Sequence, residues 1–236
     1  MALHFVADGA TDAAVGGVLV LTGAEAHHAA VVRRVRSGEP VTVGDGRGVW
    51  LDGECEDVTP KEVTVRVTAR RVEPQPTPRL VLVQALAKGD RDELAVQAAT
   101  ELGVSGVIPW AAERSVSRWE GSKLEKGRLR WEAIVREASK QSIRAWMPVV
   151  EPLATTKQIS GLVLDPTADV ALTEVALPAT GRIALIVGPE GGISPRELQL
   201  LEQQGSTRVR LGPEILRTST AGPAAIAVLN ARLGRW

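Results

Sequence analysis

The residues that decide the fold are Ile183–Gly205, IALIVGPEGGISPRELQLLEQQG, and the nearby stretch Arg208–Leu233, RVRLGPEILRTSTAGPAAIAVLNARL. Twice in this region an apolar run typical of a strand, Ile183–Val187 and then Val209–Leu211, ends at a loop that contains glycine. Each loop is followed by a helical segment. Loops at the carboxyl ends of strands are where open α/β sheets hold small ligands. The stretch therefore predicts a ligand pocket built by two loops.

The first loop, Gly188–Gly192, has three glycines, so its backbone can take positive φ angles and approach a ligand closely. The helix after it has a clear start. Ser194 is placed as the N-cap, Pro195 at the first helical position and Glu197 as the end of a capping box. No Gly-Lys-Ser/Thr follows, and the G-x-G-x-x-G spacing is absent, so the loop matches neither a P-loop nor a dinucleotide fingerprint. The pattern predicts a pocket without naming its ligand.

A linker is predicted at Glu73–Pro78, where three alternating prolines favour an extended, semi-rigid chain. Before it, short runs of alternating apolar and polar residues lie between turns rich in glycine and aspartate. They indicate a small β-barrel with one helix at Ala24–Val35. The expected strands are Val41–Val43, Val49–Leu51 and Val63–Ala69.

After the linker, strands and helices alternate, which is typical of a mainly parallel sheet with helices on both faces. Strands are expected at Leu80–Leu86, Val104–Trp110, Val170–Leu172 and Ile183–Val187, and helices at Arg91–Leu102 and Lys123–Ile143. The helix Arg91–Leu102 is expected to bury Leu94, Ala98, Ala99 and Leu102, with Gly103 closing it.

The composition is that of an ordinary globular protein, with 44% hydrophobic residues, 24% charged residues and a net charge of zero. No apolar run approaches the roughly 20 residues needed to span a bilayer, and the N-terminal residues lack the pattern of a signal peptide. The single cysteine, Cys55, excludes an internal disulfide and is expected to be a small buried residue. A cytoplasmic protein without membrane association is predicted.

The charges are unevenly distributed. Between Arg114 and Trp146 there are nine Lys or Arg against four Asp or Glu, and a second basic cluster lies at Arg33–Arg36. Each cluster alone would suit a solvated helix face, but two of them beside a pocket favour RNA as a partner. Tyr is absent and Phe5 is the only Phe, so base stacking of the kind used by RRM domains is not expected.

The strings GPEGGISPRE (188–197) and LGPEILRTSTA (211–221) resemble the signature of the RsmE family. Members of that family are S-adenosyl-L-methionine-dependent methyltransferases that modify N3 of a uridine in 16S ribosomal RNA. Segments Ala85–Val116, Trp131–Ser142 and His27–Gly48 resemble the family as well, so the likeness covers nearly the whole chain.

The resemblance implies an α/β fold of the SPOUT class, with a deep trefoil knot in the C-terminal chain around the cofactor. It divides the chain into a PUA-like RNA-binding β-barrel (1–73), the proline-rich linker (74–78) and the SPOUT methyltransferase domain (79–236). It also implies ribosomal RNA or the small ribosomal subunit as the partner, and a homodimer. The terminal helix Gly222–Leu233 offers small residues for a dimer contact, although they could equally cover their own sheet.

The resemblance places S-adenosyl-L-methionine against three segments, with glycines admitting it and leucine and isoleucine side chains around the adenine. The implied cofactor residues are Leu172, Thr173, Glu174, Val187, Gly188, Pro189, Glu190, Gly191, Gly192, Leu211, Gly212, Ile215, Leu216, Thr218 and Ala221.

The implied reaction needs a deprotonated uracil ring, because N3 carries a proton at neutral pH. Arg217 could bond a uracil carbonyl oxygen and stabilise the developing negative charge, helped by the start of the last helix near Thr218–Thr220. Glu190 could accept the proton, or it could cap neighbouring amides. All three histidines lie in the first 28 residues, so electrostatic stabilisation by Arg217 is favoured.

Contacts to RNA are expected from two groups. Lys88, Arg91 and Arg114 follow strands at one predicted edge of the sheet, where ordinary loop salt bridges are the alternative. His27, Arg33, Arg34 and Arg36 would serve the barrel, and Arg144 follows the long basic helix. The chain departs from the family at Ala2–Phe5, where an arginine-rich start is usual, and at Ile143–Arg144, where Gly-Arg is usual.

Two other functions compete with this prediction. One is a SPOUT methyltransferase that acts on another RNA, such as a tRNA ribose. The other is a non-catalytic RNA-binding module whose pocket no longer supports chemistry.

Overall fold

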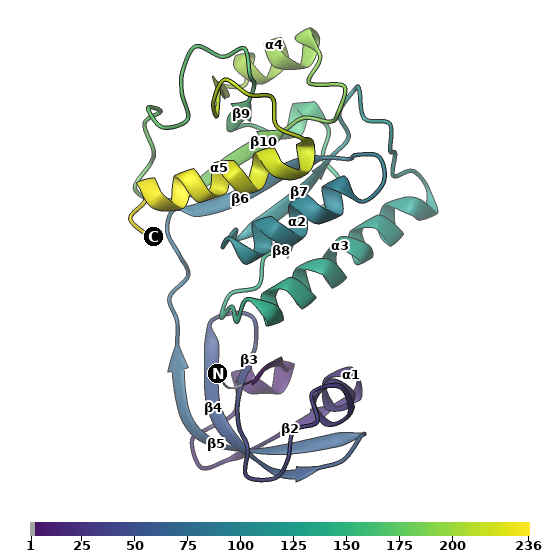
Figure 1. Ribbon diagram of the computed structural model, residues 1–236, viewed down its shortest axis with the longest axis vertical. Coiled ribbons are helices and arrows are strands. Elements are labelled where there is room, and N and C mark those ends of the chain that lie inside the picture. The colour runs from purple at the N-terminus through teal and green to yellow at the C-terminus, as the bar shows by residue number, and fades with distance from the viewer. Residues whose placement is uncertain (1–2) are drawn as a thin grey trace. The chain divides into compact units, whose positions relative to one another are not determined.

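The computed structural model describes residues 3–236, which divide into two compact units. The first unit contains the chain up to Gln75 together with Ser139–Met147, and the second contains Pro76–Ala138 and Pro148–Trp236 (Figure 1). The resemblance implied a methyltransferase domain over residues 79–236, which includes Ser139–Met147. In the structure this segment belongs to the first unit.

The first unit is built on a five-stranded sheet in the order β1-β3-β4-β5-β2. β1 and β3 are parallel, and the other pairs are antiparallel. Within residues 3–236, β1 and β2 have no pairing with each other, so the predicted small β-barrel is present as a half-barrel. The strands are β1 (Leu3–Val6), β2 (Val18–Thr22), β3 (Pro40–Gly44), β4 (Val49–Val58) and β5 (Glu62–Val72).

The predicted helix of the first unit is present in two parts, α1 (Gly23–His27) and a π-helical turn (His28–Val32), and a short 3-10 turn (Asp8–Thr11) follows β1. Alternate residues of the strands fill the core, as the alternating pattern requires. Cys55 is buried among them, as expected for a small apolar side chain.

The second unit has a six-stranded sheet in the order β11-β9-β10-β6-β7-β8, and all of its pairs are parallel. The predicted parallel α/β architecture is confirmed. Its strands are β6 (Arg79–Ala85), β7 (Gly106–Trp110), β8 (Val149–Val150), β9 (Leu162–Leu164), β10 (Arg182–Val187) and β11 (Thr207–Val209). Its helices are α2 (Arg91–Glu101), α3 (Ser122–Gln141), α4 (Pro195–Gln203) and α5 (Thr218–Arg232), with a 3-10 turn at Thr156–Gln158.

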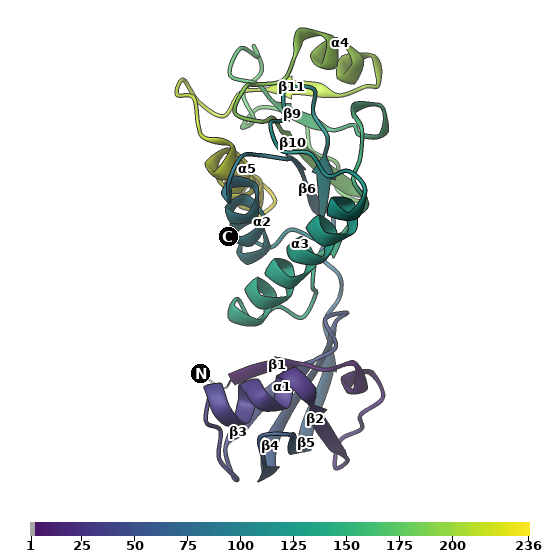
Figure 2. The same cartoon turned by 90° about the vertical axis from the view of Figure 1, so that its right-hand side faces the viewer.

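Helices cover the sheet because the central strands β6 and β10 are apolar on both faces. Helices α2 and α5 lie side by side against one face (Figure 2), while Leu201 of α4 packs into the other. At Gly222 of α5 an added Cβ would lie 2.9 Å from Cδ1 of Leu82, so this glycine lets α5 approach β6 closely. The small residues of the terminal helix therefore pack on their own sheet.

Two expectations for the second unit are wrong. Leu94 of α2 is 49% exposed, whereas Ala95, Val96 and Ala99 are buried. The side chain of Asp92 turns inward to accept a hydrogen bond from the Ala87 amide, and this sets the buried face.

The second error concerns Val170–Leu172, which form no strand; only Ala171 makes an isolated bridge, to Arg210. Within residues 3–236, no helix is long and apolar enough to cross a membrane.

Candidate functional site

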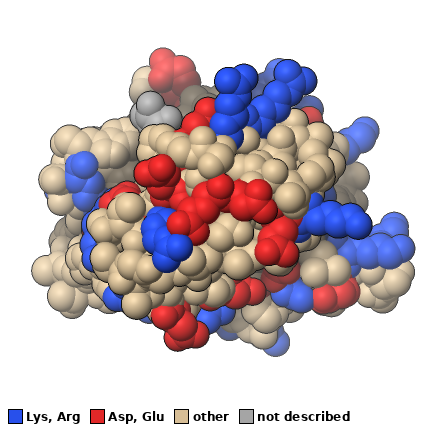
Figure 3. Space-filling model, turned by 90° about the horizontal axis from the view of Figure 1, so that it is seen from below, with Lys and Arg blue, Asp and Glu red and all other residues tan. Residues whose placement is uncertain are grey.

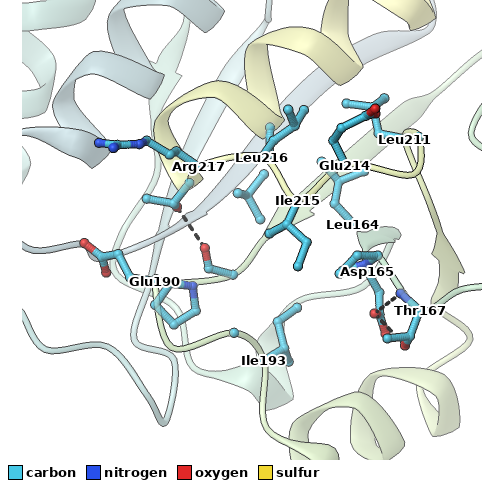
Figure 4. A pocket seen from close by; sticks show the side chains of 18 of the residues that line it. Leu164, Asp165, Thr167, Glu190, Ile193, Leu211, Glu214, Ile215, Leu216 and Arg217 are labelled. Carbon is cyan, nitrogen blue, oxygen red and sulfur yellow. Dashed lines mark hydrogen bonds between the residues drawn. The ribbon is translucent and has the colours of Figure 1, made fainter.

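A cavity of about 570 Å³ opens at the carboxyl ends of β9, β10 and β11 (Figure 4). From β6 the chain adds β7 and β8 on one side, whereas β10, β9 and β11 lie on the other side. Strand order therefore reverses next to β10, and such reversal points are where parallel sheets bind ligands. Three segments form the walls: Val187–Ile193, Leu211–Thr218 and Leu164–Thr167.

The first wall, which contains the predicted glycine loop, is fixed by a short buried chain of hydrogen bonds. The Thr218 hydroxyl donates to the Gly188 carbonyl (2.8 Å) and accepts from the Gln84 amide (2.8 Å). Gln84 lies on β6 and is fully buried. Gly192 has a φ of +71°, which is the conformation that glycine supplies to such a turn. Sequence reasoning missed Gln84, whose only signal is one polar residue in an apolar strand.

Glu190 of this loop is already bonded to one cation and to backbone amides. Its Oε1 accepts from the Lys88 amide (3.0 Å) and from Nη1 of Arg91 (2.9 Å). Burial alone raises the pKa of Glu190, but the hydrogen bonds to the Glu190 and Lys88 amides and to Arg91 outweigh it and bring the pKa below its usual value. A carboxylate with a lowered pKa is a poor proton acceptor, so the geometry supports the capping role and not that of a base.

The back of the glycine loop rests on the loop after β7. Nη1 of Arg114 donates to the Gly191 carbonyl (3.0 Å), and the Ser194 hydroxyl donates to the Glu113 carboxylate (2.6 Å). The buried carboxylate of Glu197 accepts from the Glu113 amide and closes the predicted capping box with Ser194. The segment Glu113–Arg114 thus holds both the glycine loop and the start of α4.

The second wall is apolar and open. Ile215 is 83% exposed and Leu216 is 39% exposed, and Figure 4 shows Ile215 pointing across the cavity toward Ile193. Arg217 is the N-cap residue of α5, and its guanidinium points away from the centre of the cavity, on the side where Glu190 lies. Within residues 3–236 the Arg217 side chain has no hydrogen-bond partner, so it is available to a substrate.

The third wall, Leu164–Thr167, was not predicted. Asp165 accepts from the amide and hydroxyl of Thr167 (2.9 and 2.8 Å) and from Nε of Arg208 (2.7 Å). Burial raises the pKa of Asp165, but these hydrogen bonds outweigh it, so the pKa lies below its usual value. The only signal for this wall was an Asp-Pro pair after three apolar residues.

Most of the predicted cofactor residues line the cavity: Val187, Gly188, Pro189, Glu190, Gly192, Leu211, Gly212, Ile215, Leu216, Thr218 and Ala221. Gly191, Leu172, Thr173 and Glu174 do not. Gly191 faces Arg114, and an added Cβ there would lie 3.3 Å from the Arg114 Cβ. Leu172 is buried behind the second wall, where its amide bonds the Arg210 carbonyl and its carbonyl accepts from Arg232. The segment that lines the cavity comes earlier in the chain, at β9.

The predicted RNA residues fall into two sets. In the second unit, Lys88, Arg91 and Arg114 gather around the glycine loop, although Arg91 and Arg114 also hold that loop. In the first unit four predicted side chains are exposed on α1 and just after the π-helical turn: His27, Arg33, Arg34 and Arg36. Figure 3, a view onto the first unit, shows acidic side chains grouped centrally with Lys and Arg around them, so this face is not uniformly basic.

Arg144 is half-buried in the first unit, and burial lowers its pKa to about 10. Its role as an RNA contact stays a prediction. The neighbouring Ile143 has a φ of +54°, in the left-handed region that favours glycine. That conformation explains why a glycine suits this position.

Comparison with known families gives two matches. The model of an RNA methyltransferase domain matches residues 73–230, and the model of an RNA methyltransferase PUA domain matches residues 21–68. The Ribosomal RNA small subunit methyltransferase E of Mycobacterium bovis is 39% identical over 233 residues, covering 94% of this chain and 89% of that protein. The protein of the same name from Bacillus subtilis is 30% identical, covering 89% and 88%.

Solved structures agree. The Neisseria gonorrhoeae Ribosomal RNA small subunit methyltransferase E, bound to S-adenosyl methionine, superposes with a TM-score of 0.88 at 27% identity, covering 98% of each chain. A Legionella pneumophila protein in complex with the same cofactor gives a TM-score of 0.87 at 28% identity, again covering 98% of each chain.

Proposed function

The chain belongs to the Ribosomal RNA small subunit methyltransferase E family, and from that premise we propose that it methylates N3 of a specific uridine in 16S ribosomal RNA with S-adenosyl-L-methionine. The observation that carries the proposal is the cavity at the strand reversal, with the glycine loop on one side and Arg217 at its rim. The cavity would hold the cofactor, and the unpaired guanidinium of Arg217 would bind the deprotonated uracil ring.

The cavity suits S-adenosyl-L-methionine in size and lining. Its volume of about 570 Å³ lies within the range of about 300–1,000 Å³ typical of small-molecule sites. Apolar side chains of Leu164, Leu211, Ile215 and Leu216 would hold the adenine, and the backbone at Gly188 and Gly192 would admit the polar part. When bound, the cofactor supplies an electrophilic methyl group.

The residues of the chain would orient the uridine and stabilise its deprotonated form. Arg217 would bond a uracil carbonyl oxygen, and this bond strengthens as the ring becomes anionic. The first turn of α5 begins one residue later and adds a favourable dipole for negative charge. Within residues 3–236, the cavity is lined by no histidine, and its Glu190 is held by Arg91. Electrostatic stabilisation is therefore the better mechanism, with the proton passing to solvent.

The proposal includes three finer features: a homodimer, a knotted C-terminal chain and action in the cytoplasm. Ile215 is a large apolar side chain with 83% exposure beside the cavity, and a second copy of the chain or the cofactor would cover it. Light scattering at micromolar concentration tests the dimer, and a monomeric mass would contradict it.

The test of the reaction is mass spectrometry of nucleosides. The purified protein is incubated with methyl-labelled S-adenosyl-L-methionine and with either 16S ribosomal RNA or small ribosomal subunits. We expect labelled 3-methyluridine from a single site. Ribose methylation would support the alternative SPOUT reaction, and failure to bind the cofactor in calorimetry would support the non-catalytic module.

A further inference from the structure

A second concave surface lies in the second unit, between the loop before α3 and the first turns of that helix. Figure 1 shows where α3 lies. It encloses about 430 Å³, separate from the cofactor cavity. We call it the basic hollow and define it by its lining residues: Val116, Ser117, Arg118, Trp119, Lys123, Lys126 and Gly127.

The basic hollow has a fixed framework. Trp119 packs edge-to-face on Trp131, with ring centroids 5.2 Å apart, and Trp131 is almost fully buried. Gly127 lets the indole lie directly on α3, because an added Cβ would be 2.3 Å from Cε2 of Trp119. The loop is thereby attached to the helix, so the charged side chains around it project from a defined surface.

The cations of the hollow differ from the others on α3. Arg128 pairs with Glu125 and Glu132, and Arg130 pairs with Glu93. Among the described residues, the side chains of Arg118, Lys123 and Lys126 make no ion pair or hydrogen bond. Lys123 and Lys126 are three positions apart, on the same side of the helix.

Two acids, Glu120 and Glu125, lie beside these three cations in the sequence, and Glu125 pairs with Arg128. The hollow therefore carries uncompensated positive charge, which suits an anion.

The hollow is also connected to the cofactor site. Arg114, which bonds the Gly191 carbonyl of the glycine loop, comes four residues before Arg118. Four residues span at most about 14 Å. The backbone at Arg118 therefore lies within about 14 Å of the residue that holds the glycine loop.

We propose that the basic hollow binds phosphates of the RNA strand that flanks the target uridine. The proposal rests on the proposed function for its partner and adds a place where that RNA is held. Phosphate contacts of Lys and Arg fix the register of a nucleic acid without reading its bases. An anchor a few nucleotides away would thus help to select which uridine reaches Arg217.

The test is the double variant Lys123→Gln/Lys126→Gln, matched by the control Lys61→Gln/Lys157→Gln, which removes the same charge at exposed lysines elsewhere. Binding to in vitro transcribed 16S ribosomal RNA and to purified small subunits is measured by filter binding at several salt concentrations. We expect the double variant to bind about ten-fold more weakly. The slope of log affinity against log salt should shrink by about 1.4, as for two lost single-strand phosphate contacts. The control should bind as the unchanged protein does.

Three outcomes would overturn the proposal: equal losses in the variant and the control, no measurable binding of the unchanged protein to either probe, or weaker binding to small subunits with normal binding to bare RNA. The last result would indicate a ribosomal protein as the partner of the hollow. Because binding needs no turnover, a protein that binds RNA through the hollow but makes no 3-methyluridine would contradict only the proposed reaction.

Discussion

The two loops that face each other across the cofactor cavity are held in different ways. The glycine loop is bonded at the Gly188 and Gly191 carbonyls and at the Glu190 carboxylate. The opposite loop, Gly212–Leu216, makes no hydrogen bond within residues 3–236, and Ile215 is mostly exposed. One wall is thus formed before any ligand arrives, whereas the other gains most of its contacts from what binds.

The largest effect is expected at Arg217, directly after the opposite loop Gly212–Leu216. Arg217→Ala should lower kcat by roughly 100-fold to 1,000-fold, the scale of losing one donor to a developing anion, with a smaller change in KM. Cofactor affinity should change little, because the side chain points away from the cavity centre. Steady-state and single-turnover methylation rates measure this.

The control for Arg217 is Glu214→Gln, which changes a charge in the same loop. It should retain most of the activity. A near-normal single-turnover rate with much weaker RNA binding in Arg217→Ala would make Arg217 a phosphate contact instead.

The glycine loop should lose its fixed position when the buried Thr218 hydroxyl that bonds it is removed. Thr218→Val removes the hydroxyl between Gln84 and Gly188. The Gly188 carbonyl then loses this donor and the Gln84 amide keeps only its bond to the Ala85 carbonyl, which costs about 1–3 kcal/mol. We expect cofactor affinity to fall about ten-fold in calorimetry and the Tm to fall as well. Thr220→Val, at an exposed position in the same turn, is the control and should change neither. Normal affinity in Thr218→Val would mean that the loop is held by its other bonds alone.

A smaller and more selective effect is expected at Ile215. Ile215→Ser should weaken cofactor binding about five-fold, or about 1 kcal/mol, since only part of the side chain becomes covered. The Tm of the free protein should stay unchanged, because Ile215 is already exposed there. Val149→Ser, also exposed but outside the cavity, is the control. A lower Tm in Ile215→Ser would show that the loop Gly212–Leu216 is already packed before a ligand binds.

The smallest effect concerns the pH dependence of stability, through Glu190 of the glycine loop. The folded pKa of Glu190 lies below its unfolded value, so its contribution to stability is present above the unfolded pKa and is lost as pH falls through the folded one. Glu190→Gln should remove this part of the acid-induced loss of stability. The part amounts to less than about 1 kcal/mol, because the ion pair with Arg91 is partly solvent-exposed. Thermal unfolding from pH 7 to pH 3 measures it. Identical curves for the two proteins would show that the pair contributes nothing.

The sequence predicts the parts of the site that have local signals. The capping box at Ser194 and the apolar run before Gly188 are short-range patterns, and both are present in the structure. The third wall has no such signal, because β9 is three residues long and shows no periodicity. Its partner Arg208 is more than forty residues away in the chain. The strand order of the first unit and the partial burial of Arg144 likewise depend on long-range contacts.

The return of Ser139–Met147 to the first unit has a consequence for how the chain folds during its synthesis. Within that unit, Nζ of Lys140 forms a buried ion pair with Glu25 (3.0 Å), and the Trp146 indole donates to the Glu73 carbonyl. Synthesis runs from the N-terminus, so these contacts are impossible until residue 147 has left the ribosome. By then β6, α2, β7 and α3 have also been made. The unit that is begun first can be completed only after the first segment of its neighbour, Pro76–Ala138, has been made.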